Sequence, residues 1–126
     1  MKALLIEDDD DIRAVMQMSL SRLGGMDVVQ ASSGAEGLLV ATQEVPDVIM
    51  LDVMMPNMDG PATLAMLRAN PITAGIPVIF MTAKAMPHEV ARLHEPGAAA
   101  VLTKPFDPAS LPEEIRRIVA RASTPE

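Results

Sequence analysis

Five short, mostly apolar segments recur along the chain at fairly even spacing, and patterns typical of helices separate them. Each segment has the length of a strand and is apolar on both faces, which is typical of strands buried between two layers of helices. The segments are ALLI at 3–6, MDVVQ at 26–30, DVIML at 47–51, IPVIFM at 76–81 and AAAVLT at 98–103.

The first three helical patterns lie between the first four strands. The first has one apolar face, and Gly24 and Gly25 then provide a stop signal. Its face consists of Ile12, Val15, Met16, Ser19, Leu20 and Leu23. The second pattern covers residues 34–44 and ends before Pro46. The third begins near MDGP, with Pro61 in its first turn, and runs to about Asn70.

Two further helices are predicted in the C-terminal half. The fourth starts at Pro87 and ends near Gly97, a residue suited to a left-handed C-cap. The fifth has Asp107 as its N-cap, followed by Pro108. Its buried face is expected to consist of Leu111, Ile115, Ile118 and Val119. Five strands alternating with five helices predict an α/β protein with a doubly wound parallel sheet.

Four strand ends carry polar side chains that the predicted sheet brings to one edge. Glu7 and Asp8 follow the first strand, Asp52 ends the third, Thr82 ends the fourth and Lys104 follows the fifth. Ligands of open parallel sheets bind beyond the carboxyl ends of the strands. Taken singly, each residue also fits a role as a helix cap, a turn residue or a solvated side chain. Only their joint placement favours a site.

The chemistry of this group favours a hard metal ion and phosphoryl transfer. Carboxylates brought together repel one another unless a cation neutralises them, and oxygen ligands without His or Cys select Mg²⁺ or Mn²⁺. A carboxylate beside such an ion can attack phosphorus and form an acyl phosphate. A lysine ammonium and a threonine hydroxyl could hold the other phosphoryl oxygens. The neighbouring acids 9–11 are expected only to cap the first helix and to be solvated.

Composition excludes several classes of function. A chain of 126 residues, 49% hydrophobic and 21% charged, fits one folded domain. Its net charge of −7 opposes direct binding to nucleic acid or anionic lipid. The absence of cysteine excludes disulfides, and the short apolar start is neither a signal peptide nor a membrane span. We therefore expect a cytoplasmic protein.

The segments LLIEDD, DVIMLDVMMPNMDG, IPVIFMTA and GAAAVLTKPFDP together resemble the receiver domain of two-component response regulators. The resemblance covers residues 2–120. It implies the chemotaxis-regulator-like, flavodoxin-like (βα)5 fold, with strand order 2-1-3-4-5. It also implies a receiver domain over residues 1–121, a flexible tail over 122–126 and no output domain in this chain.

The resemblance further implies a role for each site residue. Asp52 would be the phospho-acceptor, and Thr82 and Lys104 would contact the phosphoryl group. Mg²⁺ would be bound by Asp8, Asp52, Glu7 and the main-chain carbonyl of Met54. The Lys104–Pro105 peptide bond would be cis.

The implied activity is that of a self-phosphorylating switch rather than a metabolic enzyme. A sensor histidine kinase or a histidine phosphotransfer protein would supply the phosphoryl group. A face made by the fourth helix, fifth strand and fifth helix would pass the signal to a protein target or output domain. The switch would act as a monomer or as a phosphorylation-dependent dimer.

One position departs from the family pattern, and two others are positions that control the rate of hydrolysis in the family. Val101 stands where the family usually has a switch aromatic, so we expect weaker coupling to the distal face. Met54 and Lys84 flank the acceptor at positions that tune hydrolysis, and the Met54 side chain cannot orient a water by hydrogen bonding. We therefore predict a long-lived phosphoryl group.

Other functions remain alternatives at this point. A phosphatase of the haloacid-dehalogenase kind would need a second Asp at position 54, which is Met. A flavodoxin-like cofactor carrier would need a loop rich in Gly and hydroxyl groups after the first strand, where this chain has five acids. A degenerate receiver would only bind partners. His88 and His94 are six residues apart, and we expect both to be solvated helix residues.

Overall fold

The computed structural model describes residues 1–83, 89, 91–92 and 97–123. In order, its elements are β1 (Lys2–Ile6), α1 (Asp10–Met18), the π-helix η1 (Ser19–Leu23), β2 (Asp27–Ala31), α2 (Gly34–Glu44), β3 (Val48–Asp52), α3 (Gly60–Ala69), β4 (Val78–Thr82), β5 (Ala100–Thr103) and α5 (Leu111–Ser123). Most of the helix predicted over 87–97, with His88 and His94, lies outside the described residues. Within the described ranges, no helix combines the length and apolarity needed to cross a membrane.

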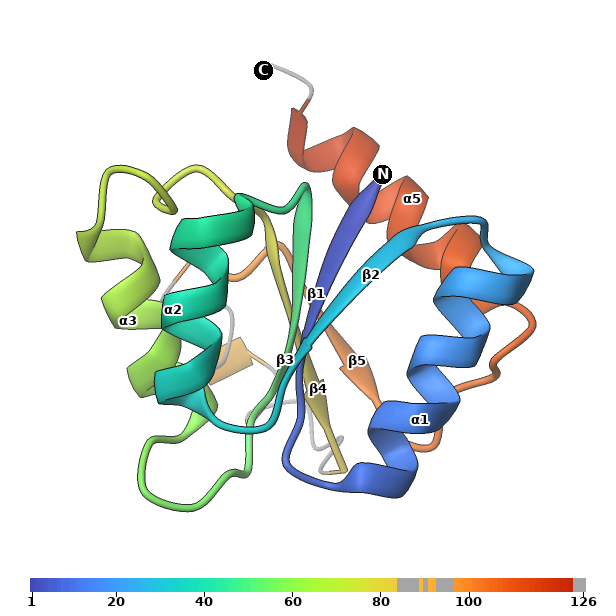
Figure 1. The fold of residues 1–126 in the computed structure, drawn as a ribbon, viewed down its shortest axis with the longest axis horizontal. Helices are drawn as coiled ribbons and strands as arrows, with labels where there is room; N and C mark the ends of the chain where they lie inside the picture. The colour runs from blue at the N-terminus through green and yellow to red at the C-terminus, as the bar shows by residue number, and fades with distance from the viewer. Residues whose placement is uncertain (84–88, 90, 93–96, 124–126) are drawn as a thin grey trace.

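The five strands form one parallel sheet in the order β2-β1-β3-β4-β5. In this register Ile6 is the partner of Leu51, Asp52 of Met81, and Thr82 of Thr103. The doubly wound fold and the strand order 2-1-3-4-5 are therefore confirmed. Because all strands run the same way, the carboxyl ends of β1, β3, β4 and β5 lie at one edge, at the bottom of Figure 1.

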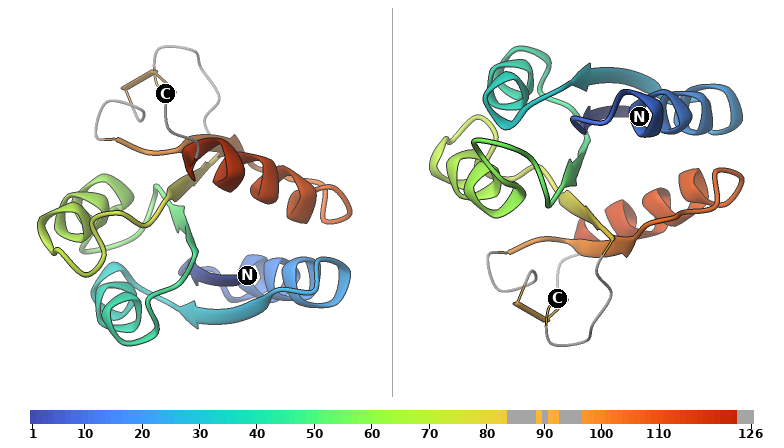
Figure 2. Two further views of the ribbon diagram at one scale, coloured as in Figure 1. Left: turned by 90° about the horizontal axis from the view of Figure 1, so that it is seen from above. Right: turned by 90° about the horizontal axis from the view of Figure 1, so that it is seen from below.

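Helices cover both faces of the sheet (Figures 1 and 2). Alternate residues of each strand point to opposite faces. Leu4 and Ile6 belong to the core under α2 and α3, while Ala3 and Leu5 belong to the core under α1 and α5. Strands β3 and β4 are buried throughout, but β2 at the sheet edge is mostly exposed or half-buried. The other edge strand, β5, is likewise half-buried or exposed. The expectation of burial on both faces therefore fails for both edge strands.

The beginning of α3 lies directly against the end of β3. The Asp59 side chain caps the helix by accepting a hydrogen bond from the Ala62 N–H, and Pro61 lies in the first turn as predicted. The Gly60 N–H donates to the Val53 carbonyl at 3.0 Å. A Cβ at Gly60 would lie 2.8 Å from the Asp52 carbonyl oxygen, so only glycine permits this approach. This close packing fixes the main chain next to Asp52.

The first helix differs from the sequence prediction in its last turn. Asp9 caps α1 as expected, by accepting hydrogen bonds from the N–H groups of Asp11 and Ile12. The chain then continues as η1 instead of ending as an α-helix. A π-turn contains extra residues and rotates the following side chains around the axis. Leu23, predicted on the buried face, ends this turn and is 60% exposed. Val15, which precedes the turn, is 41% exposed.

The last helix starts later than predicted. Asp107 heads a turn, in which its carboxylate accepts from the Ala109 N–H and its carbonyl from the N–H groups of Ser110 and Leu111. Helix α5 begins at Leu111, so Asp107 is not its N-cap. Leu111 and Ile115 are buried as predicted, whereas Ile118 and Val119 are only partly buried. The helix extends through Ser123, so the first two residues predicted for the tail are helical.

Candidate functional site

A cavity of about 220 Å³ lies at the carboxyl edge of the sheet. It is lined by side chains that come from the ends of β1, β3, β4 and β5 and from the first turn of α1. The lining residues are Glu7, Asp8, Asp9, Ile12, Asp52, Met54, Ala83 and Lys104. The fold therefore brings together the acids and the lysine predicted from the strand ends, although Glu7 and Lys104 lie 97 positions apart in the chain.

Lys104 connects two buried carboxylates in this cavity. Its Nζ donates hydrogen bonds to Glu7 Oε1 at 2.6 Å and to Asp52 Oδ1 at 3.2 Å. The side chains of Glu7 and Asp52 are only 3% and 6% exposed. Burial lowers the pKa of Lys104, but its hydrogen bond to Glu7 and the charges of Asp52 and Glu7 outweigh this effect and raise it. The ammonium therefore stays charged at neutral pH.

Glu7 lies in an unfavourable position for a negative charge. Burial, together with its hydrogen bond to Asp52 and the Asp52 charge, raises its pKa to about 7, although Lys104 opposes the shift. Buried ion pairs recover the cost of desolvation only with good additional partners, so they are weak evidence for a purely stabilising role. A pocket that holds more negative charge than one lysine neutralises favours a second cation.

The carboxylates fit a hard divalent ion. Oxygen atoms of Glu7, Asp8 and Asp52 all lie within 4.8 Å of one another. Adjacent ligands around an octahedral Mg²⁺ lie roughly 3 Å apart and opposite ones roughly 4 Å apart. Asp8 is exposed, whereas Glu7 and Asp52 are buried, so the acidic cluster opens to solvent on the Asp8 side. An all-oxygen set of this size and charge suits Mg²⁺ or Mn²⁺.

The structure describes most of the other residues predicted for the site. Thr82 is buried at the end of β4, and its carbonyl accepts a hydrogen bond from the Lys104 N–H at 2.8 Å. The Met54 N–H donates to Asp52 Oδ1 at 3.3 Å, and the Met54 side chain is 64% exposed. The Lys104–Pro105 peptide bond is cis. Val101 is half-buried in β5 beside Phe80 of β4. Lys84 lies outside the described residues.

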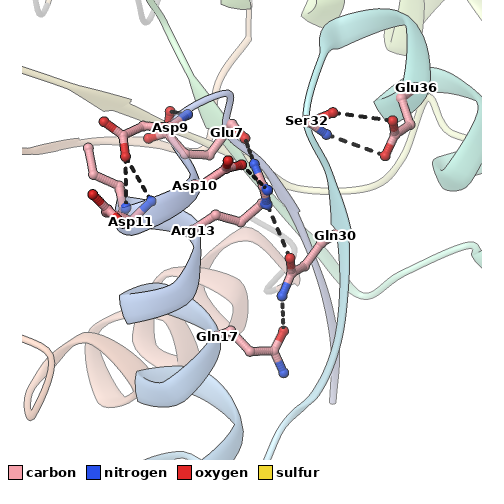
Figure 3. Close-up of polar contacts among 10 residues, drawn as sticks. Glu7, Asp9, Asp10, Asp11, Arg13, Gln17, Gln30, Ser32 and Glu36 are labelled. Atoms are coloured by element: carbon pink, nitrogen blue, oxygen red, sulfur yellow. Dashed lines mark hydrogen bonds and ion pairs between the residues drawn. The ribbon is translucent and has the colours of Figure 1, made fainter.

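Sequence reasoning missed one residue next to the site. The Arg13 guanidinium donates to the main-chain carbonyl of Glu7 at 2.7 Å and also contacts Asp10 and Gln30 (Figure 3). The signal that could have revealed it is a cation three residues after Asp10, on the same helix face and within an otherwise acidic stretch.

A second, apolar hollow of about 520 Å³ adjoins the site. It lies between the first turns of α1 and the loop after β5, and the two cavities share Ile12, Ala83 and Lys104. The remaining lining residues are Asp11, Val15, Pro105 and Phe106. The exposure of Val15, unexpected for a core helix face, follows from this opening.

Fold and site together define a class of protein: doubly wound α/β domains with an acidic pocket and a lysine at the carboxyl edge of the sheet. The family model for the response regulator receiver domain matches residues 3–116. The chain therefore belongs to the response regulator receiver domain family. This membership decides against the haloacid-dehalogenase-like phosphatase and the flavodoxin-like carrier.

Two curated relatives illustrate the match. The chain is 37% identical over 120 residues to the DNA-binding dual master transcriptional regulator RpaA of Synechocystis. The aligned residues cover 95% of this chain and 49% of that protein. It is 36% identical over 121 residues to the alkaline phosphatase synthesis transcriptional regulatory protein PhoP of Bacillus subtilis. This alignment covers 96% of this chain and 49% of that protein. The chain thus spans about half the length of the curated relatives it matches.

Solved structures agree with this assignment. The chain resembles the chemotaxis protein CheY4 of Vibrio cholerae with a TM-score of 0.86 and 30% identity, over 93% of this chain and 97% of that one. It resembles a putative response regulator from Chloroflexus aurantiacus with a TM-score of 0.87 and 32% identity, over 95% and 98%.

Proposed function

We propose that this chain is a phosphorylation-dependent signalling switch in which Asp52 accepts a phosphoryl group in a reaction that requires Mg²⁺. The observation that carries the proposal is the contact of buried Asp52 with the Lys104 ammonium inside a cluster of three carboxylates. The donor would be the phosphohistidine of a sensor histidine kinase or histidine phosphotransfer protein. The cysteine-free composition is compatible with the cytoplasm, where we place the switch.

The chemical step is a transfer between two nucleophiles. An Asp52 carboxylate oxygen attacks phosphorus, an O–P bond forms, and the P–N bond of the phosphohistidine breaks. The leaving imidazole nitrogen takes up a proton from solvent. Later, water attacks phosphorus, which releases inorganic phosphate and regenerates the carboxylate. The chain thus hydrolyses its own phosphoryl group and needs no reactant other than the phosphodonor and water.

Each site residue contributes to this step in a defined way. Asp8, Glu7, Asp52 and the Met54 main-chain carbonyl would hold Mg²⁺, which would neutralise charge on the phosphoryl oxygens. Lys104 supplies a fixed positive charge beside Asp52, and the Thr82 hydroxyl is a further donor at the end of β4. The apolar hollow beside the site offers a donor protein a surface next to Asp52.

Mass spectrometry with a small-molecule phosphodonor tests the acceptor directly. The wild-type chain, incubated with acetyl phosphate and Mg²⁺, should gain the mass of one phosphoryl group. In a parallel incubation with EDTA in place of Mg²⁺, no adduct should form. Asp52→Asn should gain none, because an amide does not form an acyl phosphate. Asp27→Asn, at an exposed acid on β2, is the matched control and should react like the wild type. An adduct on Asp52→Asn would contradict the assignment.

The output step is proposed on the basis of the family and of Val101. We expect phosphorylation to move the loop after Thr82 and to alter the face that includes β5 and α5, which would then bind a protein target or an output domain. Val101 cannot swing as an aromatic ring would, so coupling to that face should be weak. NMR of the phosphorylated chain tests this, since an unchanged amide shift at Ala83 would show that the loop does not respond.

A further inference from the structure

The guanidinium of Arg13 links three segments around the acidic end of β1 (Figure 3). Its Nη1 donates to the Glu7 carbonyl at 2.7 Å, its Nη2 contacts Asp10 Oδ1, and its Nε donates to Gln30 Oε1 at 3.1 Å. Gln30 lies on β2 and is itself held by Gln17 of α1 through a hydrogen bond of 2.6 Å. The Arg13 side chain is only 16% exposed, so these contacts are partly shielded from water.

The peptide unit that follows Glu7 is the part of the chain that Arg13 fixes. Strand β1 ends at Ile6, so the Glu7 carbonyl lies beyond the last strand residue. The Glu7 N–H donates to the Ala31 carbonyl at 3.1 Å, and Arg13 donates to the Glu7 carbonyl. Residue 7 is therefore held at both its N–H and its carbonyl. Its carbonyl belongs to the peptide unit that joins Glu7 to Asp8, the two consecutive acids of the cluster.

We infer that Arg13 is a positioning residue for the divalent cation, acting by fixing the Glu7–Asp8 peptide and hence the directions of both carboxylates. The inference rests on the proposed function of the site. A planar guanidinium with several acceptors loses little further freedom per hydrogen bond and holds its partners in one geometry. Groups that orient metal ligands without touching the metal typically change metal affinity about 10- to 100-fold when they are removed.

The positive charge of Arg13 by itself would weaken Mg²⁺ binding, whereas its positioning role would strengthen it. The direction in which the Mg²⁺ affinity changes on substitution therefore tests the inference. A nearby positive charge repels a cation, so removing a purely electrostatic Arg13 would strengthen Mg²⁺ binding. Asp10 already pairs with this charge and salt screens it, so this effect is small. A positioning role predicts that the same substitution weakens binding.

Isothermal titration of the full chain with MgCl₂ measures the affinity. Arg13→Gln should raise the Kd about tenfold. Arg13→Lys should raise it less, because one ammonium can reach the Glu7 carbonyl but cannot hold three acceptors in a fixed fork. Arg22→Gln is the matched control: it removes the same charge from exposed Arg22 in η1 and should leave the Kd unchanged or slightly lower.

Phosphorylation by acetyl phosphate gives an independent readout. The rate for Arg13→Gln should fall at low Mg²⁺ and return to the wild-type value at saturating Mg²⁺, since only metal binding is impaired. Far-UV circular dichroism verifies the fold, and if Arg13→Gln does not fold, Arg13→Lys alone carries the test. A Kd for Arg13→Lys at or below that of the wild type would overturn the inference. If the wild type binds no Mg²⁺, both the proposed function and this inference are refuted. If the wild type binds Mg²⁺ and the Arg13 variants have the same Kd, only the role of Arg13 is refuted.

Discussion

Glu7 shows how one buried side chain sets the requirements of the whole pocket. It contacts Lys104 and lies beside Asp52, and only 3% of its side chain is exposed. With a pKa of about 7, this carboxylate would be the object of competition between a proton and the proposed metal ion near neutral pH. The charge of Glu7 is therefore sensitive to pH near neutrality.

Mg²⁺ affinity should rise with pH because of this competition. Below pH 7 most Glu7 is protonated and cannot bind the metal as an anion, while above pH 7 it is ionised. The Kd measured by calorimetry should fall about tenfold between pH 6 and pH 8. Glu7→Gln is the control, and its weaker binding should change little over this range. A wild-type Kd that is flat across the range would contradict the raised pKa.

Met54 is expected to control the lifetime of the phosphoryl group. Its exposed thioether lines the cavity beside Asp52 and offers an attacking water no strong hydrogen bond. Met54→Asn provides an amide that can orient the water, so dephosphorylation should become several-fold faster. Loss of radiolabel after removal of the donor measures this rate. Met66→Asn, at a similarly exposed methionine on α3, should behave like the wild type, and wild-type decay within seconds would refute the prediction.

At the scale of elements, the junction of β3 and α3 fixes the main chain at Asp52. Gly60 is the first residue of α3, and its Cα faces the main chain of Asp52 and Val53. Backbone atoms cannot rotate away as the end of a side chain can. Helix α3 can therefore approach the sheet this closely only because position 60 carries no Cβ.

Gly60→Ala should destabilise the fold and disturb the site together. The new Cβ would lie 2.8 Å from both the Asp52 carbonyl oxygen and the Val53 Cα, so the helix must shift. Overpacking of this kind costs about 1–3 kcal/mol, measurable as a lower urea midpoint. Gly75→Ala is the matched control, since a Cβ at that position would have no neighbouring atom within 4 Å, and it should change stability by less than about 0.5 kcal/mol. Equal midpoints for the two variants would argue against the close packing.

At the scale of the whole molecule, the parallel sheet concentrates negative charge at one edge. The chain carries 17 acidic and 10 basic residues, and the acids Glu7, Asp8 and Asp52 meet where two neighbouring strands or their loops end. Because folding raises the Glu7 pKa above its value in the unfolded chain, this group contributes stability at low pH that is lost as the pH rises through about 7. A bound cation would offset that loss.

Mg²⁺ should therefore stabilise the folded chain above pH 7. A ligand that binds only the folded state adds about 1.4 kcal/mol at a concentration ten times its Kd. Thermal unfolding at pH 8, with MgCl₂ compared against NaCl of equal ionic strength, should show a higher Tm with Mg²⁺. Asp8→Ala should lose most of this increase, because it removes the solvent-facing carboxylate of the cluster. An identical Tm in both salts would mean that the folded chain does not bind Mg²⁺.

Several elements were predictable because their signals are local. The second helix was predicted over residues 34–44, as observed, since the break at Pro46 lies next to it, and the structure adds a cap from the Ser33 side chain. The η1 turn and the start of α5 were not, because neither follows from local signals. Ser19 in η1 donates to the Pro108 carbonyl at 2.6 Å, and Gly24 packs against Pro112, so contacts between distant segments accompany both features.

Alternating apolar segments and helical patterns were enough to specify a parallel sheet and therefore to place Glu7, Asp52, Thr82 and Lys104 at one edge, because the direction of parallel strands leaves no other arrangement. The contacts within that edge could not be predicted from the sequence. The bridge from Lys104 to Glu7 and Asp52, the raised pKa of Glu7 and the hold of Arg13 on the Glu7 carbonyl depend on burial and on distances between segments remote in the chain. Such quantities exist only after the chain has folded, since desolvation and electrostatic coupling are properties of the packed pocket.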